Sequence, residues 1–310
     1  MSQADKRRSQ RTSKHNAKRT ASQERGVWNQ PQRKRRRKLS QNFLKDEQTA
    51  RKIVGEAGIT DRDLVVEFGA GAGMITRALS KKARKVLAVE YDPFWVAQLK
   101  QTFSANENVK IVAGDALSVD LPNEPFRTVA NLPFHISTSI LHRLLDDPTQ
   151  PLEFAHLLVQ KEFATKHARA SPTTLKTLGW SPWYRFEAGF VVPASAFDPR
   201  PEVDACLLVA AKRGPPLVAS EHRELFRALV RGVFNGRGNV VGKALRPVFS
   251  KKQIRRLAHD NGFSADSFPS QLTVYQWANI FEFMVRTVPQ SRWPMPESTA
   301  KHHFGRAGQR

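Results

Sequence analysis

The chain has 310 residues, of which 40% are hydrophobic, so most of its length can build a packed core. A single cysteine, Cys206, excludes an internal disulfide, and no apolar run approaches the roughly 20 residues of a membrane span. The charged N-terminus has no apolar segment behind it, so we expect no signal peptide, no membrane contact and a cytoplasmic protein.

The net charge of +22 is unevenly distributed. Residues 1–38 hold 14 Lys and Arg against 2 Asp and Glu, and residues 212–256 hold 12 against 2, whereas residues 39–211 hold 19 against 20. Neutralising phosphates with such basic regions releases counterions, which favours binding to nucleic acid. A solvated basic arm remains the alternative for the first region taken alone, but two basic regions flanking a neutral one indicate a polyanionic partner.

The expected elements alternate along the chain. Residues 1–38 contain almost no aliphatic residues and predict a disordered basic tail. Helical patterns separate the first five predicted strands, which indicates a mostly parallel α/β sheet with helices on both faces, and the last two strands should pair antiparallel at one edge. The predicted strands are residues 64–68, 86–90, 109–112, 128–130, 154–159, 186–192 and 205–210.

Helical patterns follow the last strand, near residues 221–235, 251–262 and 273–285. We therefore expect four regions: the tail 1–38, an α/β catalytic domain over 39–212, a small helical domain over 213–286 and a polar tail over 287–310.

A glycine-rich turn follows the first strand, in the order Glu67-Phe68-Gly69-Ala70-Gly71-Ala72-Gly73. Glycines allow a sharp turn and a close approach of backbone to a ligand. Such a turn by itself can be purely structural, and dinucleotide-binding proteins have similar ones. The carboxylate of Glu67 would repel a pyrophosphate but could support a ligand with an amino group, which disfavours a nicotinamide-dependent dehydrogenase.

Two further acidic residues end the next strands. Glu90 follows Gly73 by 17 residues and can accept hydrogen bonds from ribose hydroxyls, although a strand-end surface carboxylate would look the same. Asp115 follows the third strand and could accept from an adenine amino group. Open α/β sheets bind ligands at the carboxyl ends of their strands, so Glu67, Glu90 and Asp115 should share one edge.

The fourth strand leads into Asn131-Leu132-Pro133-Phe134. An adenine amino group is a poor nucleophile because its lone pair is delocalised into the ring. The Asn131 side-chain oxygen and the Leu132 carbonyl could hold its hydrogens, with Pro133 fixing the turn. Phe134 could stack on the base, although a core phenylalanine beside an Asn-Pro turn remains open.

These motifs together resemble the rRNA adenine N6-methyltransferases, which include the Erm 23S rRNA methylases of macrolide resistance and the 16S rRNA adenine dimethylases. The resemblance covers about residues 40–285. It rests also on Gln41-Asn42-Phe43-Leu44, Gly114-Asp115-Ala116 and Phe197-Asp198-Pro199-Arg200-Pro201-Glu202-Val203-Asp204.

The resemblance implies a class I, Rossmann-like methyltransferase fold and S-adenosyl-L-methionine as cofactor, and no metal site is expected. Phe197 would sandwich a flipped base opposite Phe134, unless it is a core aromatic before a proline-rich turn. The cofactor would contact Asn42, Leu44, Gly69, Gly71, Glu90, Tyr91, Asp115, Ala116 and Asn131.

Within the family, the chain looks more like actinomycete Erm enzymes. The shared features are Trp180-Ser181-Pro182-Trp183-Tyr184, Leu272-Thr273-Val274-Tyr275-Gln276-Trp277 and Phe281-Glu282-Phe283. Asp198 departs from the family, where a basic or neutral residue is usual. We therefore expect N6-methylation of a 23S rRNA adenine; the alternatives are a 16S dimethylase of ribosome assembly and a noncatalytic nucleic-acid-binding relative.

Three arginines of the helical region are the predicted RNA contacts. Arg223, Arg227 and Arg231 recur at i, i+4 and i+8, so on a helix they share one face. We expect this face to orient the RNA and the tail to add affinity only; a merely solvated face is the alternative. No obligate protein partner is indicated.

Overall fold

The computed structural model describes residues 42–169, 171, 174–236 and 240–296. The predicted basic tail 1–38 lies outside the described residues, as do residues 297–310. Among the helices that are described, none combines the length and the apolar composition needed to span a bilayer.

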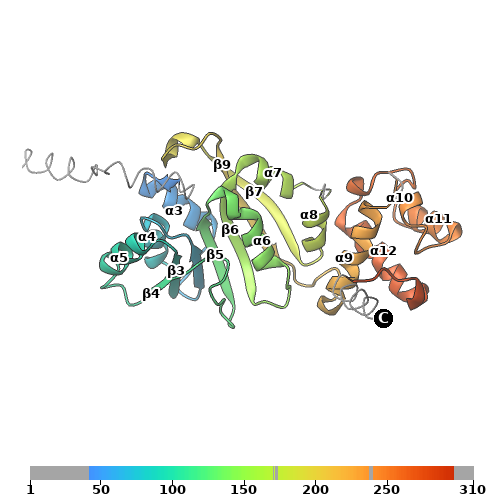
Figure 1. Cartoon of the computed structure of the whole chain (residues 1–310), viewed down its shortest axis with the longest axis horizontal. Coiled ribbons are helices and arrows are strands. Elements are labelled where there is room, and N and C mark those ends of the chain that lie inside the picture. Colours follow the sequence, from blue (N-terminus) through green and yellow to red (C-terminus); the bar gives the residue numbers. More distant parts are fainter. Residues whose placement is uncertain (1–41, 170, 172–173, 237–239, 297–310) are drawn as a thin grey trace, which may run out of the picture. The chain divides into compact units, whose positions relative to one another are not determined.

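A seven-stranded sheet forms the centre of the catalytic region (Figure 1). The strands from β4 to β6 run parallel, and β9 is antiparallel to both of its neighbours, which leaves β7 at the edge. The spatial order is β4 (Val109–Ala113), β3 (Lys85–Glu90), β2 (Leu64–Phe68), β5 (Phe126–Asn131), β6 (Leu152–Gln160), β9 (Ala205–Lys212) and β7 (Tyr184–Val192).

The predicted strands are all present, and the last two pair antiparallel at one edge as expected. This mostly parallel sheet confirms the predicted class I methyltransferase architecture. The direction in which the chain adds strands reverses at β2: β3 and β4 follow on one side of it, and β5 and β6 on the other. In open α/β sheets a ligand site lies beside such a reversal, at the carboxyl ends of the strands.

Helices cover both faces of the sheet because successive side chains of a strand point to opposite faces and pack into two separate hydrophobic cores. Val65 of β2 belongs to the core under α4 (Met74–Ser80), whereas Val66 belongs to the core on the opposite face, under α6 (Ser137–Leu145). The other helices between strands are α3 (Glu47–Glu56), α5 (Pro93–Thr102), α7 (Lys161–His167) and α8 (Leu175–Trp180).

The second core continues into the C-terminal helices, where Phe226, Trp277 and Met284 are buried. The packed structure also extends past residue 286, since Val288 is buried and Trp293 packs against the same core. These helices are α9 (Arg223–Phe234), α10 (Val241–Ala244), α11 (Lys251–Asp260) and α12 (Val274–Thr287). The domain boundary after residue 212 stays a prediction.

Several short elements are absent from the sequence predictions. They include α7, α8, α10 and a two-stranded sheet of β1 (Phe43–Leu44) and β8 (Phe197–Asp198). Segments this short carry too few residues to show a helical or alternating pattern. The β1–β8 pairing matters most, because it brings the segment before α3 to the sheet edge where the motifs lie.

Candidate active site

Segments distant in the sequence meet at the carboxyl ends of β2, β3 and β5. One pocket is lined by Phe43 and Leu44 from β1, Glu67 and Gly69 from the glycine turn, and Asn131 from the end of β5. Backbone bonds hold the turn to the neighbouring strand, since Gly69 N–H donates to the Val89 carbonyl at 2.9 Å. The segment of β1, the glycine turn and Asn131 therefore line one pocket.

The glycine turn needs glycine at Gly71 for two reasons. Its φ of +53° lies in the left-handed region, which side chains disfavour. In addition, the Phe43 ring occupies the space that a Cβ at this position would need. Phe43 itself packs against Trp95, with ring centroids 5.1 Å apart. The turn is thus closed on one side by an aromatic side chain from β1.

Glu90 is buried and binds the backbone of this turn. Its carboxylate accepts from the N–H groups of Gly71 at 2.8 Å, Tyr91 at 2.9 Å and Asp92 at 2.8 Å. Burial raises the pKa of Glu90, while these three bonds oppose that effect. A carboxylate has about four acceptor positions, so roughly one remains for a ligand hydroxyl. The predicted pair of bonds to a ribose would therefore compete with the turn.

Glu67 lies in the pocket and is 2% exposed. Burial raises the pKa of its carboxyl group to about 8, although the Thr76 hydroxyl donates to it at 2.6 Å. A group with this pKa is mostly protonated at neutral pH. A cation placed beside it would favour the carboxylate, so the site suits a ligand that carries an ammonium group.

Asn131 is oriented by the segment before β1. Its Nδ2 donates to the Asn42 carbonyl at 2.8 Å, although the two residues are 89 positions apart. Because the amide nitrogen is used there, the Oδ1 atom is the acceptor that remains for a substrate amine. Asn131 also lines the pocket, which places the acceptor at its wall.

The other motif residues differ in exposure. Leu132 is buried, and Pro133 and Phe134 are half-buried at the start of the turn that leads into α6. Phe197 is fully buried in the core under α3 and α4. Its ring has no solvent-accessible face. In this structure Phe197 is therefore a core aromatic residue, which is the alternative to base stacking that the sequence left open. Base stacking by Phe197 stays a prediction that requires the ring to become exposed.

Tyr91, Asp115 and Ala116 lie along the ends of β3 and β4. The Gly114 N–H donates to the Glu90 carbonyl at 3.0 Å and so holds these two strand ends together. Tyr91 is 69% exposed, Asp115 is exposed and Ala116 is buried. One oxygen of Asp115 accepts from the Leu117 N–H at 2.9 Å. Acceptance from an adenine amino group by its second oxygen stays a prediction.

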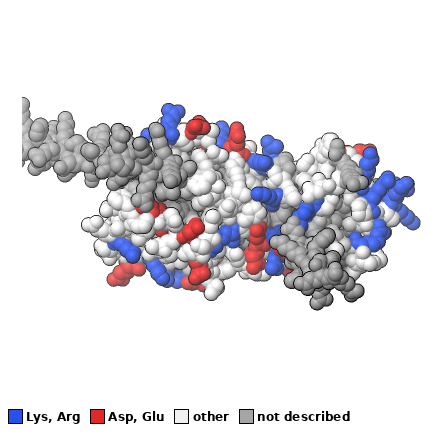
Figure 2. Space-filling view, viewed as in Figure 1, with Lys and Arg blue, Asp and Glu red and all other residues white. Residues whose placement is uncertain are grey.

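The three predicted RNA contacts lie on one side of α9, but that side faces other elements. Arg223, Arg227 and Arg231 all line a second cavity, together with residues of α6 and α8. Arg227 is only 14% exposed. Exposed basic side chains lie instead on α11, where Figure 2 shows Lys and Arg gathered, and they are Lys251, Lys252, Arg255 and Arg256. RNA contact by the three α9 arginines stays a prediction.

Sequence reasoning missed Thr76 and the contacts that Phe43 and Asn42 make within the site. Phe43 was quoted only as part of a motif, yet it covers the glycine turn. Thr76 bonds Glu67, and Asn42 contributes its carbonyl to Asn131. A hydroxyl in the first turn of the helix after a glycine turn was the available signal for Thr76. No local signal reveals the contact of Asn42.

Comparisons with known proteins identify the family of the chain. The family model described as ribosomal RNA adenine dimethylase matches residues 32–286. An rRNA adenine N-6-methyltransferase of Corynebacterium diphtheriae is 37% identical over 211 residues, which are 68% of this chain and 82% of that protein. The mycinamicin-resistance protein MyrB of Micromonospora griseorubida is 34% identical and covers 83% of each chain.

Two further similarities concern the fold and the target. The crystal structure of the 23S rRNA methyltransferase ErmE superposes with a TM-score of 0.72 at 27% identity, over 79% of this chain and all of that one. A probable ribosomal RNA small subunit methyltransferase A of Methanococcus maripaludis is 35% identical over 71% of this chain and 84% of that protein. The chain therefore belongs to the ribosomal RNA adenine dimethylase family and is an rRNA adenine N6-methyltransferase.

Proposed function

We propose that the chain methylates an adenine N6 atom in 23S rRNA in the cytoplasm, with S-adenosyl-L-methionine as donor, and thereby protects the ribosome against macrolide-type antibiotics. The observation that carries the chemistry is Asn131, whose amide nitrogen is bound to the Asn42 carbonyl so that its oxygen remains for the target amine. Similarity to ErmE supports the choice of 23S rRNA, and similarity to the mycinamicin-resistance protein MyrB supports the role in antibiotic resistance.

The residues of the site fit this cofactor. A buried carboxyl group, Glu67, suits the ammonium of its amino acid part, and Glu90 has about one acceptor position left for a ribose hydroxyl. The turn beside them has glycine at three positions with positive φ, which are Gly69, Gly71 and Gly73. Asp115, exposed at the end of β4, would accept from the adenine amino group. When bound, the cofactor supplies an electrophilic methyl group.

The chain's own contribution is to hold the target base. An adenine inside a duplex is inaccessible, so it must leave the stack and enter the pocket. The Asn131 side-chain oxygen and the Leu132 carbonyl would accept its two amine hydrogens. Phe134 would stack on the ring and keep the amine directed at the pocket. A strong base is unnecessary, since no proton has to leave before the attack.

A direct test offers the protein separate 23S and 16S rRNA transcripts with isotopically labelled cofactor. Mass spectrometry of the digested RNA should find N6-methyladenine or N6,N6-dimethyladenine in the 23S transcript only. Cells that express the chain should lose macrolide susceptibility. Methylation of the 16S transcript alone would replace the proposal by a role in small-subunit assembly, which the similarity to a small-subunit methyltransferase keeps as the second candidate.

A further inference from the structure

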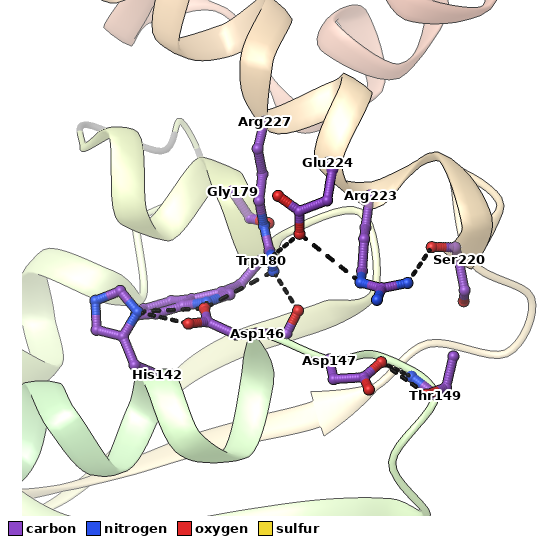
Figure 3. Close-up of polar contacts among 10 residues, drawn as sticks. All are labelled: His142, Asp146, Asp147, Thr149, Gly179, Trp180, Ser220, Arg223, Glu224 and Arg227. Carbon is purple, nitrogen blue, oxygen red and sulfur yellow. Dashed lines mark hydrogen bonds and ion pairs between the residues drawn. The ribbon is translucent and has the colours of Figure 1, made fainter. Parts of the chain in front are cut away.

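Arg227 of α9 joins three elements across a cavity of about 460 Å³ (Figure 3). Its guanidinium donates to the Asp146 carbonyl at 2.7 Å, to the Gly179 carbonyl at 3.3 Å and to Glu224 Oε1 at 3.1 Å. Asp146 follows the last residue of α6, and Gly179 belongs to α8. One side chain thus connects the first C-terminal helix with two helices of the catalytic region.

The Asp146 side chain extends this connection. Its Oδ1 accepts from the Trp180 indole at 2.7 Å, and its Oδ2 lies 3.0 Å from His142 Nδ1. All of these groups surround the C-terminal end of α6 (Figure 3). The opposite end of α6 continues directly from the turn Phe134–Ile136, which follows the Asn131-Leu132-Pro133-Phe134 motif. A single helix therefore runs from the candidate active site to Arg227.

The two sides of α9 are packed differently. Its apolar side is held by Phe226, whose ring meets Trp183 edge-on at 5.9 Å and Phe281 at 5.6 Å. The side that carries Arg227 faces the cavity. On that side α9 contacts α8 but also borders the cavity, so a directional polar contact there adds to packing in setting the angle between α9 and the helices of the catalytic region. The planar guanidinium, with its donors in a fixed fork, provides that contact.

We propose that Arg227 is a positioning residue for the methylation reaction. It holds the C-terminal helices at a fixed angle to α6, so that RNA bound on those helices presents its adenine to Asn131 and Phe134. Three of its five guanidinium N–H groups donate within the protein, and in this proposal the side chain acts by fixing the helices and not by contacting a phosphate. The consequence for catalysis depends on the proposed function; the fixed angle does not.

A distance measurement tests the angle without any activity. Spin labels are attached at two exposed positions, Lys110→Cys of β4 and Arg255→Cys of α11. The native thiol, Cys206, is only 2% exposed and should not take up the label. Arg227→Lys keeps the positive charge but loses the planar set of guanidinium donors. It should broaden the distribution of distances between the two labels about twofold. Arg286→Lys is the matched control, because Arg286 makes an exposed pair with Glu282 on α12. An unchanged distribution in Arg227→Lys would overturn the proposal.

Kinetics test the consequence. Arg227→Lys should lower kcat on the methylated rRNA transcript roughly 10–100-fold, with less than about a threefold change in cofactor Kd and in KM for RNA. If kcat fell only as much as the amount of folded protein, Arg227 would have a purely structural role, and the proposal would be overturned. Unchanged kcat despite a broadened distribution would overturn the catalytic part. If the unaltered chain methylated no rRNA, the proposed function would fail. The distances between the spin labels would still show whether Arg227 fixes the angle between the C-terminal helices and α6.

Salt dependence separates positioning from RNA contact. Arg227→Gln removes the charge and should leave the slope of log K for the rRNA transcript against log salt unchanged. A direct phosphate contact would lower that slope by roughly 0.7–0.9, and this result would contradict the proposal.

Discussion

Asn131 shows how one side chain depends on a distant segment. The amide nitrogen is bound to the Asn42 carbonyl at 2.8 Å, and this bond decides which end of the amide faces the pocket. Rotation of the amide would place two hydrogens where an acceptor is needed. The segment before β1 therefore sets the chemistry available at the end of β5.

Asn131→Ala should lower turnover roughly 10²–10³-fold, since a directed polar group of this kind contributes about 2.7–4 kcal/mol to the transition state. The protein should remain folded, with cofactor Kd changed less than about tenfold. Single-turnover kinetics on rRNA measure the effect. Asn279→Ala, which removes an exposed amide on α12, is the matched control and should behave as the unaltered chain. Turnover of Asn131→Ala close to normal would refute the role.

Glu67 combines burial with a position in the pocket. Because burial raises its pKa to about 8, the free protein carries a proton there at pH 7. A ligand ammonium lowers the pKa, so cofactor binding should release up to one proton at pH 7. Calorimetry in two buffers with different ionisation enthalpies counts that proton. Glu67→Gln should abolish the release, and a binding enthalpy independent of buffer in the unaltered chain would rule out this coupling.

At the scale of elements, α11 is an amphipathic helix with a basic exposed face. Ile254 and Leu257 are buried, whereas four Lys and Arg side chains are exposed. The Ser250 hydroxyl and the Gln253 side chain form a capping box that fixes where the helix begins. An anchored helix can present its charges to phosphates at defined positions, which a solvated tail cannot do.

Replacing Lys251, Lys252, Arg255 and Arg256 by Gln should weaken rRNA binding and flatten its salt dependence. The slope of log K against log salt should fall by roughly 0.7–0.9 for each lost phosphate contact. An equal change of charge at the amino end of β3 is provided by the exposed residues Lys81, Lys82, Arg84 and Lys85. Equal losses of rRNA affinity in the two quadruple variants would mean that binding depends on net charge and not on the position of the charges.

At the scale of the whole molecule, three buried groups make stability depend on pH. Burial lowers the pKa of His156 and of His167 to about 4. Both folded-state pKa values lie below the ordinary histidine value of 6.5, so the unfolded chain binds these protons first. Stability therefore falls as pH decreases from about 6.5 to about 4. Glu67 acts oppositely: its raised pKa makes stability fall as pH rises from about 4.5 to about 8.

The free energy of unfolding without cofactor should therefore be greatest near pH 6.5, with each group contributing at most about 1.4 kcal/mol per pH unit. Urea unfolding at several pH values measures this. Glu67→Gln should remove the alkaline decline and His167→Gln should reduce the acid decline. A stability that did not change between pH 4.5 and 8 would show that these groups titrate normally in the folded chain.

The sequence by itself determined the sheet and the identity of the motifs. Strands of five to nine residues produce local apolar patterns, and the glycine turn and the Asn131–Phe134 motif are contiguous, so no knowledge of distant contacts is required. Their order along the chain also predicts a shared edge, because parallel strands point the same way. For these features local chemistry and topology rules are sufficient.

Only the tertiary structure decided which surfaces face solvent and which acceptors are free. The spacing of Arg223, Arg227 and Arg231 predicts a shared helix face, but periodicity is the same whether that face meets water or another helix. The same holds for Phe197, whose ring the core encloses. Burial also sets the pKa of Glu67, and the Asn42 carbonyl orients Asn131 across 89 positions. These properties depend on neighbours that are distant in sequence, so no local pattern encodes them.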